Sequence, residues 1–254
     1  MPVIQRLCNY GFFRAGGVLV GTHAFLTFGN MLGVRWGDAS RTQDVDFAHG
    51  NRSLVIALPN DFSMDTDAAT QSLEMGLLPV SSLTSKSGAT YLSPKEPDFR
   101  LGFLTTCHRS GDQPFAHPRL GVTLQPLKFM EFSLLDAQQA VLIAGDTAVA
   151  VSVPHPALYA LYKLIAYGER KGSFAEKSNK DLLQTGFLLS RLKETRGWEV
   201  DEAWNDLKQL GKGRGEQEIR RRDALGRVMP ELGVGTWLAH WRSSFDGVFR
   251  VHSR

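Results

Sequence analysis

The 254 residues could form one large domain or two small ones, and a composition of 43% hydrophobic and 22% charged residues excludes a disordered chain. The formal net charge of +3 permits a polyanionic partner without arguing for one. With two cysteines, no signal-peptide pattern and no apolar run of about 18 residues, we expect a cytoplasmic protein without a disulfide framework or membrane span.

The first half of the chain predicts strands and helices in alternation. The apolar run 17–21, closed by glycine, predicts a buried strand, and Thr22 is expected to cap a helix over 23–32. A second helix is expected over 65–75, before Gly76. Further strands are expected over 44–48, 53–58, 80–83, 90–92, 99–105 and 127–132, and a hairpin over 140–143 and 148–153.

At Pro154 the alternation of apolar and polar residues stops and helical spacing follows. Because proline suits the first turn of a helix, we place a domain boundary there. The sequence therefore predicts an α+β fold with a mixed sheet and flanking helices in residues 1–153. A helical domain, expected to close the active site, follows in residues 154–254.

The segment Arg41-Thr42-Gln43-Asp44-Val45-Asp46-Phe47 carries two aspartates two positions apart. On a strand, both carboxylates point to the same face, roughly 7 Å apart along it. Hard divalent ions, Mg²⁺ above all, prefer such oxygen ligands. The alternative to a metal site is that Asp44 is an ordinary surface residue and Asp46 a turn residue.

The Gly21-Thr22 pair upstream of these aspartates suggests how a phosphate could reach such a metal. Glycine lets backbone amides approach a phosphate closely, and the start of the next helix carries a partial positive charge. A metal between Asp44 and Asp46 would then bridge phosphate oxygens and offset the charge of a leaving pyrophosphate. The alternative for Gly21 is a simple strand end.

Basic residues recur at the start of the helical half. Lys163 and Arg170, seven apart, fall on one helix face, and Lys180 follows near the next helix start. Converging cations would clamp a triphosphate, whereas a solvated helix face is the alternative. Asp181 also completes a capping box at 178–181 for a helix over 180–192, which would explain it without any catalytic role.

The order of these motifs resembles the nucleotidyltransferase superfamily, which has the DNA polymerase β-like fold. Val20-Gly21-Thr22 and the Asp44–Asp46 strand match its first motif, and Lys163 with Lys180-Asp181 is similar to its second. The pattern is closest to bacterial proteins related to abortive-infection and toxin–antitoxin toxins.

The resemblance implies site residues and ligands. Asp44, Asp46, Lys163 and Asp181 would be catalytic, with Mg²⁺ or Mn²⁺ on the two β-strand aspartates. The NTP would contact residues at both motifs: Gly21, Thr22, Arg41 and Lys180. The superfamily also implies a third carboxylate on a neighbouring strand, where this sequence has Gly102.

The resemblance leads to two hypotheses about the function. The first is an enzyme that moves a nucleoside monophosphate from an NTP to an acceptor, either an RNA end such as that of tRNA or a small molecule. An antitoxin-type protein partner would accompany a toxin. The second is a nucleotide-binding or interaction module of the same fold with weakened catalysis, which Gly102 favours.

Overall fold

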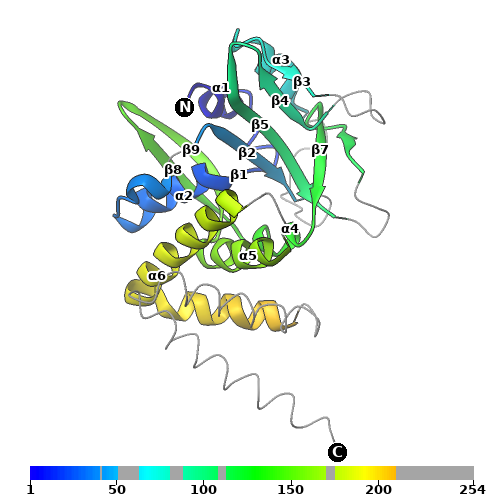
Figure 1. Cartoon of the computed structure of the whole chain (residues 1–254). Helices are drawn as coiled ribbons and strands as arrows, with labels where there is room; N and C mark the ends of the chain where they lie inside the picture. The colour runs from blue at the N-terminus through cyan, green and yellow to red at the C-terminus, as the bar shows by residue number, and fades with distance from the viewer. Residues whose placement is uncertain (41, 51–62, 81–87, 108–112, 170–174, 210–254) are drawn as a thin grey trace, which may run out of the picture. The chain divides into compact units, whose positions relative to one another are not determined.

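The computed structural model describes residues 1–40, 42–50, 63–80, 88–107, 113–169 and 175–209 (Figure 1). The chain divides into two compact units, Met1–His155 and Pro156–Arg254. We describe each unit by itself. The expected strand 53–58, most of the expected strand 80–83 and Arg41 lie outside the described residues.

A mixed sheet forms the centre of the first unit, and seven strands contribute to it within the described residues. Strand β2 (Asp44–His49), next to the edge strand, runs antiparallel to β1 (Gly17–Val20) and parallel to β5 (Glu96–Thr106). The remaining strands extend the sheet on the far side of β5: β4 (Thr90–Ser93), β3 (Leu78–Pro79), β7 (Val122–Leu127) and β6 (Phe115–His117). The predicted α+β class is confirmed.

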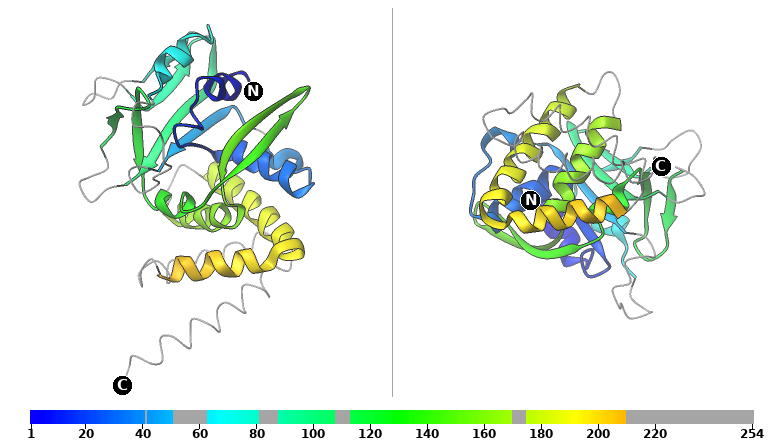
Figure 2. Two further views of the ribbon diagram at one scale, coloured as in Figure 1. Left: turned by 180° about the vertical axis from the view of Figure 1, so that it is seen from behind. Right: turned by 90° about the horizontal axis from the view of Figure 1, so that it is seen from below.

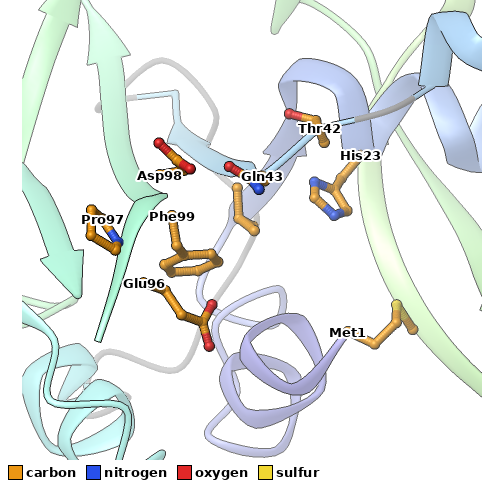
Figure 3. Close-up of a pocket in the computed structure, with 9 residues that line it drawn as sticks. Met1, His23, Thr42, Gln43, Glu96, Pro97, Asp98 and Phe99 are labelled. Carbon is orange, nitrogen blue, oxygen red and sulfur yellow. The ribbon is translucent and has the colours of Figure 1, made fainter. Parts of the chain in front are cut away.

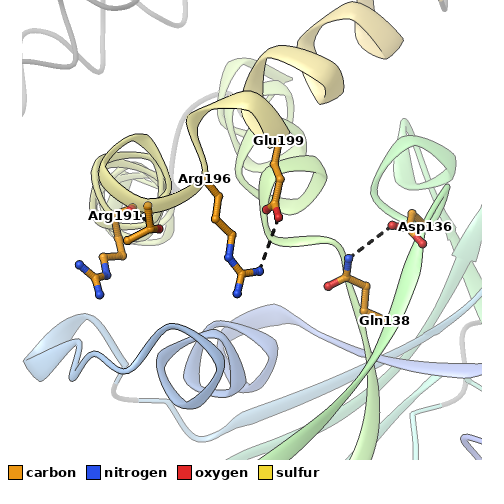
Figure 4. Close-up of polar contacts among 6 residues, drawn as sticks. Asp136, Gln138, Arg191, Arg196 and Glu199 are labelled. Atoms are coloured by element: carbon orange, nitrogen blue, oxygen red, sulfur yellow. Dashed lines mark hydrogen bonds and ion pairs between the residues drawn. The ribbon is translucent and has the colours of Figure 1, made fainter.

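A long hairpin of β8 (Ala137–Ala144) and β9 (Thr147–Pro154) lies beside this sheet. It contacts α2 (Gly21–Leu32) through β8 and contacts β1 through β9, as the view from behind shows (Figure 2). The predicted hairpin is confirmed, with Gly145 in its turn. At the open end of the hairpin, the Gln138 amide donates a hydrogen bond of 3.5 Å to the Asp136 carboxylate (Figure 4).

Aromatic side chains fill the core under one face of the sheet. The rings of Phe47 and Phe103, from neighbouring strands, stack with centroids 5.8 Å apart. Phe12 meets Phe47 edge-on at 5.1 Å, and all three rings are fully buried. Because side chains alternate along a strand, this burial turns the positions on either side of Phe47 towards the opposite face.

Four shorter helical segments complete the first unit in its described part: α1 (Pro2–Asn9), η1 (Gly37–Ser40), α3 (Thr66–Gln71) and α4 (Met130–Ser133). The sequence pattern did not predict α1. The helix expected over 65–75 is shorter, because Asp65 caps α3 and the chain leaves helical geometry by Glu74, whose φ is +55°.

The strand expected over 127–132 is wrong. The strand there is β7, which ends at Leu127, and the chain reverses at Phe129, whose φ is +64°. Met130 and Phe132 are then buried from the short helix α4. A short apolar run fits a buried strand or a buried helical turn equally well, so its periodicity could not distinguish them.

The second unit consists, in its described part, of α5 (Pro156–Glu169) packed against the long α6 (Ala175–Gln209). Helix α6 bends at Arg196, whose φ of −150° and ψ of 45° are not helical. The Arg196 guanidinium reaches Glu199 across the bend at 3.5 Å (Figure 4). No helix in the described ranges is long and apolar enough to cross a membrane.

Candidate functional site

The two aspartates of the candidate site lie on strand β2 of the first unit. Asp44 begins β2, and its backbone N–H donates to the Thr42 hydroxyl at 3.2 Å, which fixes the turn into the strand. Val45 and Phe47 are buried in the core, whereas Asp44 and Asp46 are half-buried. Both carboxylates therefore share the sheet face opposite the aromatic core, as predicted from their spacing.

The Gly-Thr pair lies beside Asp46 because of the turn between β1 and α2. Val20, the last residue of β1, pairs with Asp46 and is also the residue that precedes the helix. Helix α2 therefore begins at Gly21, and Thr22 belongs to its first turn. The expectation that Thr22 caps this helix is wrong, because the chain enters the helix one residue earlier.

The Asp46 carboxylate fits between two glycines. A Cβ atom added to Gly102 would lie 2.7 Å from Oδ1 of Asp46, and one added to Gly21 would lie 2.7 Å from Oδ2. Contacts that short essentially never occur for real Cβ atoms. Gly21 also has a φ of +64°, which L side chains rarely adopt. Both oxygens of Asp46 thus occupy space that only glycine leaves open.

The third carboxylate expected from the resemblance is absent from the described part of the chain. Gly102 pairs directly with Asp46 in the parallel register of β2 and β5, so it stands where that acid would be. Asp98 belongs to the exposed start of β5. Among the described residues, no group of three His, Cys, Asp or Glu side chains could hold a metal ion.

Two carboxylates still fit a magnesium site. Mg²⁺ keeps several waters and is usually bound through one or two carboxylates together with substrate phosphates, rather than by a full protein cage. Asp44 and Asp46 share one face, and the two adjacent glycines leave open the space that the Asp46 carboxylate occupies. The donor set therefore suits a hard cation that arrives with a phosphate.

A pocket of about 440 Å³ opens at the start of β2 and β5 (Figure 3). The rings of His23, from the first turn of α2, and Phe99 lie on two sides of it, with Gln43 between them. Its other lining residues are Met1, Thr42, Val45, Glu96, Pro97 and Asp98. Asp44 and Asp46 do not line it, in keeping with their place on the other face from Val45. The pocket is thus a neighbour of the carboxylate pair, with a volume that suits a small molecule.

The second motif forms its own cluster inside the second unit. Lys163 on α5 and Asp181 on α6 make an ion pair at 2.6 Å, with side chains 11% and 6% exposed. The Lys163 ammonium also lies 5.3 Å from the centre of the Tyr159 ring, one helical turn earlier, and the Tyr159 hydroxyl donates to Gln184 at 3.3 Å. Sequence reasoning missed Tyr159 and Gln184, although each lies three or four positions from a predicted residue.

The capping interpretation of Asp181 is wrong. Helix α6 begins at Ala175, so Asp181 lies within the helix rather than in its first turn. Lys180 is its neighbour in the helix and is half-buried. The pattern Ser-x-x-Asp occurs by chance inside helices, and only the true start of the helix separates the two cases. The assignment of Lys163, Lys180 and Asp181 to the nucleotide stays a prediction.

A pair of histidines lies at the opposite end of β2 from Asp44. The ring centroids of His49 and His117 are 4.5 Å apart, and a ring nitrogen of His49 is 3.1 Å from the Ala15 carbonyl oxygen. Within the described residues, the buried Nδ1 atoms of both rings have no hydrogen-bond partner. Burial, with smaller effects from His49 and Arg119, lowers the pKa of His117 to about 4. Burial likewise lowers the pKa of His49, against the opposing effect of the bond to Ala15.

This pair predicts a loss of stability in weak acid. An unfolded histidine titrates near pH 6.5, so the unfolded chain binds a proton before folded His117 does. The contribution of His117 to the free energy of unfolding is complete above about pH 6.5. It decreases as the pH falls towards the folded pKa of about 4, by no more than about 1.4 kcal/mol per pH unit for one group. Urea unfolding of wild type and His117→Gln at pH 7.0 and pH 5.0 measures this slope. Wild type should lose more stability than the variant; equal losses would exclude His117 as the cause.

A scan against protein-family models agrees with the motif-based resemblance to nucleotidyltransferases. A family model described as Nucleotidyltransferase matches residues 1–209. A crystal structure of an antigenic nucleotidyltransferase-like protein from Paracoccidioides brasiliensis aligns with 85% of this chain and 91% of that chain, at 14% sequence identity and a TM-score of 0.41. No curated protein matches this chain.

Proposed function

Because this chain belongs to the nucleotidyltransferase family, we propose that it transfers a nucleoside monophosphate from an NTP to an acceptor. In this reaction an acceptor hydroxyl oxygen forms a bond to the α-phosphorus and the bond from that phosphorus to the bridging oxygen breaks. Pyrophosphate leaves, and the hydroxyl proton passes to solvent.

The observation that supports this proposal is the carboxylate pair beside the Gly21 turn. Asp44 and Asp46 share one face of β2, and the helix that follows Gly21 begins next to Asp46. When bound there, Mg²⁺ or Mn²⁺ would neutralise charge on the triphosphate and on the departing pyrophosphate. The chain's own contribution is to hold two oxygen ligands and a helix start in fixed relation, so that the phosphate arrives already aligned.

The acceptor divides the proposal into two arms. An RNA end fits the mildly basic chain and the toxin-like resemblance, whereas a small-molecule acceptor fits the family resemblance equally. For the RNA arm, an antitoxin-type protein would be the partner. A module that binds nucleotide without turnover is the second candidate, favoured by the lack of a third carboxylate in the described ranges.

Transfer from labelled nucleotides tests these candidates. The protein is incubated with each α-³²P-labelled NTP, Mg²⁺ and total tRNA, or a panel of small hydroxyl compounds. Label moving to RNA or to a small molecule identifies the acceptor class. Binding of NTP with no transfer to any acceptor would favour the module, and failure to bind any NTP would contradict both candidates.

A further inference from the structure

We propose that Gly102 is a positioning residue of the metal site, rather than the trace of a lost ligand. This inference rests on the proposed function, since it concerns how the chain holds one of the two expected metal ligands. Its basis is the register of β2 and β5 together with the space around the Asp46 carboxylate.

The sheet geometry makes the residue at 102 a direct neighbour of Asp46. The two residues are Cα partners on parallel strands, so side chains at both positions emerge on the same face about 5 Å apart. Any Cβ at 102 would lie 2.7 Å from Oδ1 of Asp46. An aspartate at 102 would bring a third carboxylate, but its Cβ would displace the carboxylate of Asp46. The acid expected from the superfamily and the present orientation of Asp46 therefore exclude each other.

Gly102 and Gly21 bound the carboxylate in different ways. At Gly102 the nearest atom to an added Cβ is the far end of the Asp46 side chain, which can rotate away at little cost to the fold. A Cβ added to Gly21 would also lie only 3.3 Å from the Cβ atom of Asp46, which cannot move without the backbone. The φ of +64° at Gly21 disfavours any L residue. Substitution at Gly21 would therefore disturb the backbone, whereas substitution at Gly102 acts on the carboxylate.

Gly102→Ala is expected to weaken metal binding while leaving the fold intact. The displaced carboxylate should lower the affinity for Mn²⁺ by about tenfold or more, as is usual when a group that orients a metal ligand is changed. Titration calorimetry with Mn²⁺, alone and with a non-hydrolysable NTP, measures the affinity, and a thermal melt should shift by only a few degrees. Gly197→Ala is the matched control, because a Cβ there meets nothing within 4 Å.

A mutant cycle separates positioning from a general structural effect. If Gly102 acts through Asp46, the double variant Gly102→Ala/Asp46→Asn should bind Mn²⁺ no worse than Asp46→Asn alone. Additive losses, or wild-type affinity in Gly102→Ala, would overturn the proposal. A higher Mn²⁺ affinity in Gly102→Asp than in wild type would also overturn it, since glycine would then be a missing ligand.

A crystal structure of the Gly102→Ala variant keeps this inference testable apart from the proposed function. If wild type binds neither Mn²⁺ nor an NTP, the proposed function fails. The orientation of the Asp46 side chain in the variant then still shows whether Gly102 positions it. A rotated Asp46 side chain in Gly102→Ala supports positioning by the glycine. An unchanged Asp46 side chain would contradict it.

Discussion

Asp46→Asn is expected to reduce nucleotidyl transfer by at least 10²- to 10³-fold, on the order of the loss when one preorganised electrostatic group is removed from an active site. The amide keeps the shape of the side chain, so it still fits between Gly21 and Gly102, but it removes a negative charge from the metal site. Single-turnover transfer to the acceptor that the labelling experiment identifies measures the rate, and a thermal melt should differ little from that of wild type.

The control for this substitution is Asp146→Asn. Asp146 is an exposed aspartate in the turn of the β8–β9 hairpin, so the same chemical change is made far along the chain from β2. Transfer by Asp146→Asn should stay within about twofold of wild type, as for surface substitutions generally. Wild-type rates in Asp46→Asn would rule out this carboxylate as a metal ligand.

Lys163→Met is expected to destabilise the protein by roughly 3 kcal/mol, because removing one partner of a buried ion pair leaves the other charge uncompensated. The Asp181 carboxylate is only 6% exposed and lies 2.6 Å from the Lys163 ammonium. Methionine keeps most of the volume of the lysine stem, so the loss reports on charge rather than on a cavity. Urea unfolding, followed by circular dichroism, measures the free energy.

Two further variants establish whether the Lys163–Asp181 pair is the cause. The double variant Lys163→Met/Asp181→Leu should recover most of the stability, since an apolar pair of similar volume often replaces a buried ion pair without loss. Glu194→Gln breaks an exposed ion pair with Arg191, in which the Glu194 side chain is 64% exposed. This substitution should lower the free energy of unfolding by no more than about 0.5 kcal/mol. If Lys163→Met is as harmless as Glu194→Gln, the pair contributes nothing to stability.

The stabilised double variant also tests the catalytic assignment from the second motif. If Lys163 and Asp181 act on the nucleotide, transfer should remain low although stability has returned. If transfer recovers together with stability, the pair serves the fold alone. Stability and activity thus give separate readouts for the same two residues.

The parts of the site that the sequence predicted depend on local periodicity. Asp44 and Asp46 could be assigned to one strand face because Val45 and Phe47 alternate with them, and alternation is visible in a few consecutive residues. The strand that ends beside Gly21 was predicted from a short apolar run closed by glycine, although its pairing with β2 was not. The β8–β9 hairpin was predicted for the same reason, since its turn and both strands are contiguous.

The parts that could not be predicted depend on pairing between distant segments. The role of Gly102 follows from the parallel register of β5 with β2, which no local pattern encodes. The family resemblance implied only that an acid was to be expected where Gly102 stands. Lys163 and Asp181 were identified separately, but their mutual contact required the packing of α5 on α6. The start of α6 lies upstream of the apparent capping box, so local capping chemistry misled the interpretation of Asp181.

The position of β2 between two neighbouring strands has a consequence for ligand binding. Hydrogen bonds to β1 and β5 hold the strand from both sides, and Phe47 anchors it to the fully buried aromatic core. The amide protons of residues 46–49, which pair on both sides, should exchange only in openings that approach global unfolding, so we expect Asp46 to lose little conformational entropy if a metal and nucleotide bind there. If the proposed function holds, the affinity of the site would depend on the stability of the sheet, and we expect substitutions that loosen the aromatic core to weaken nucleotide binding without touching the ligand.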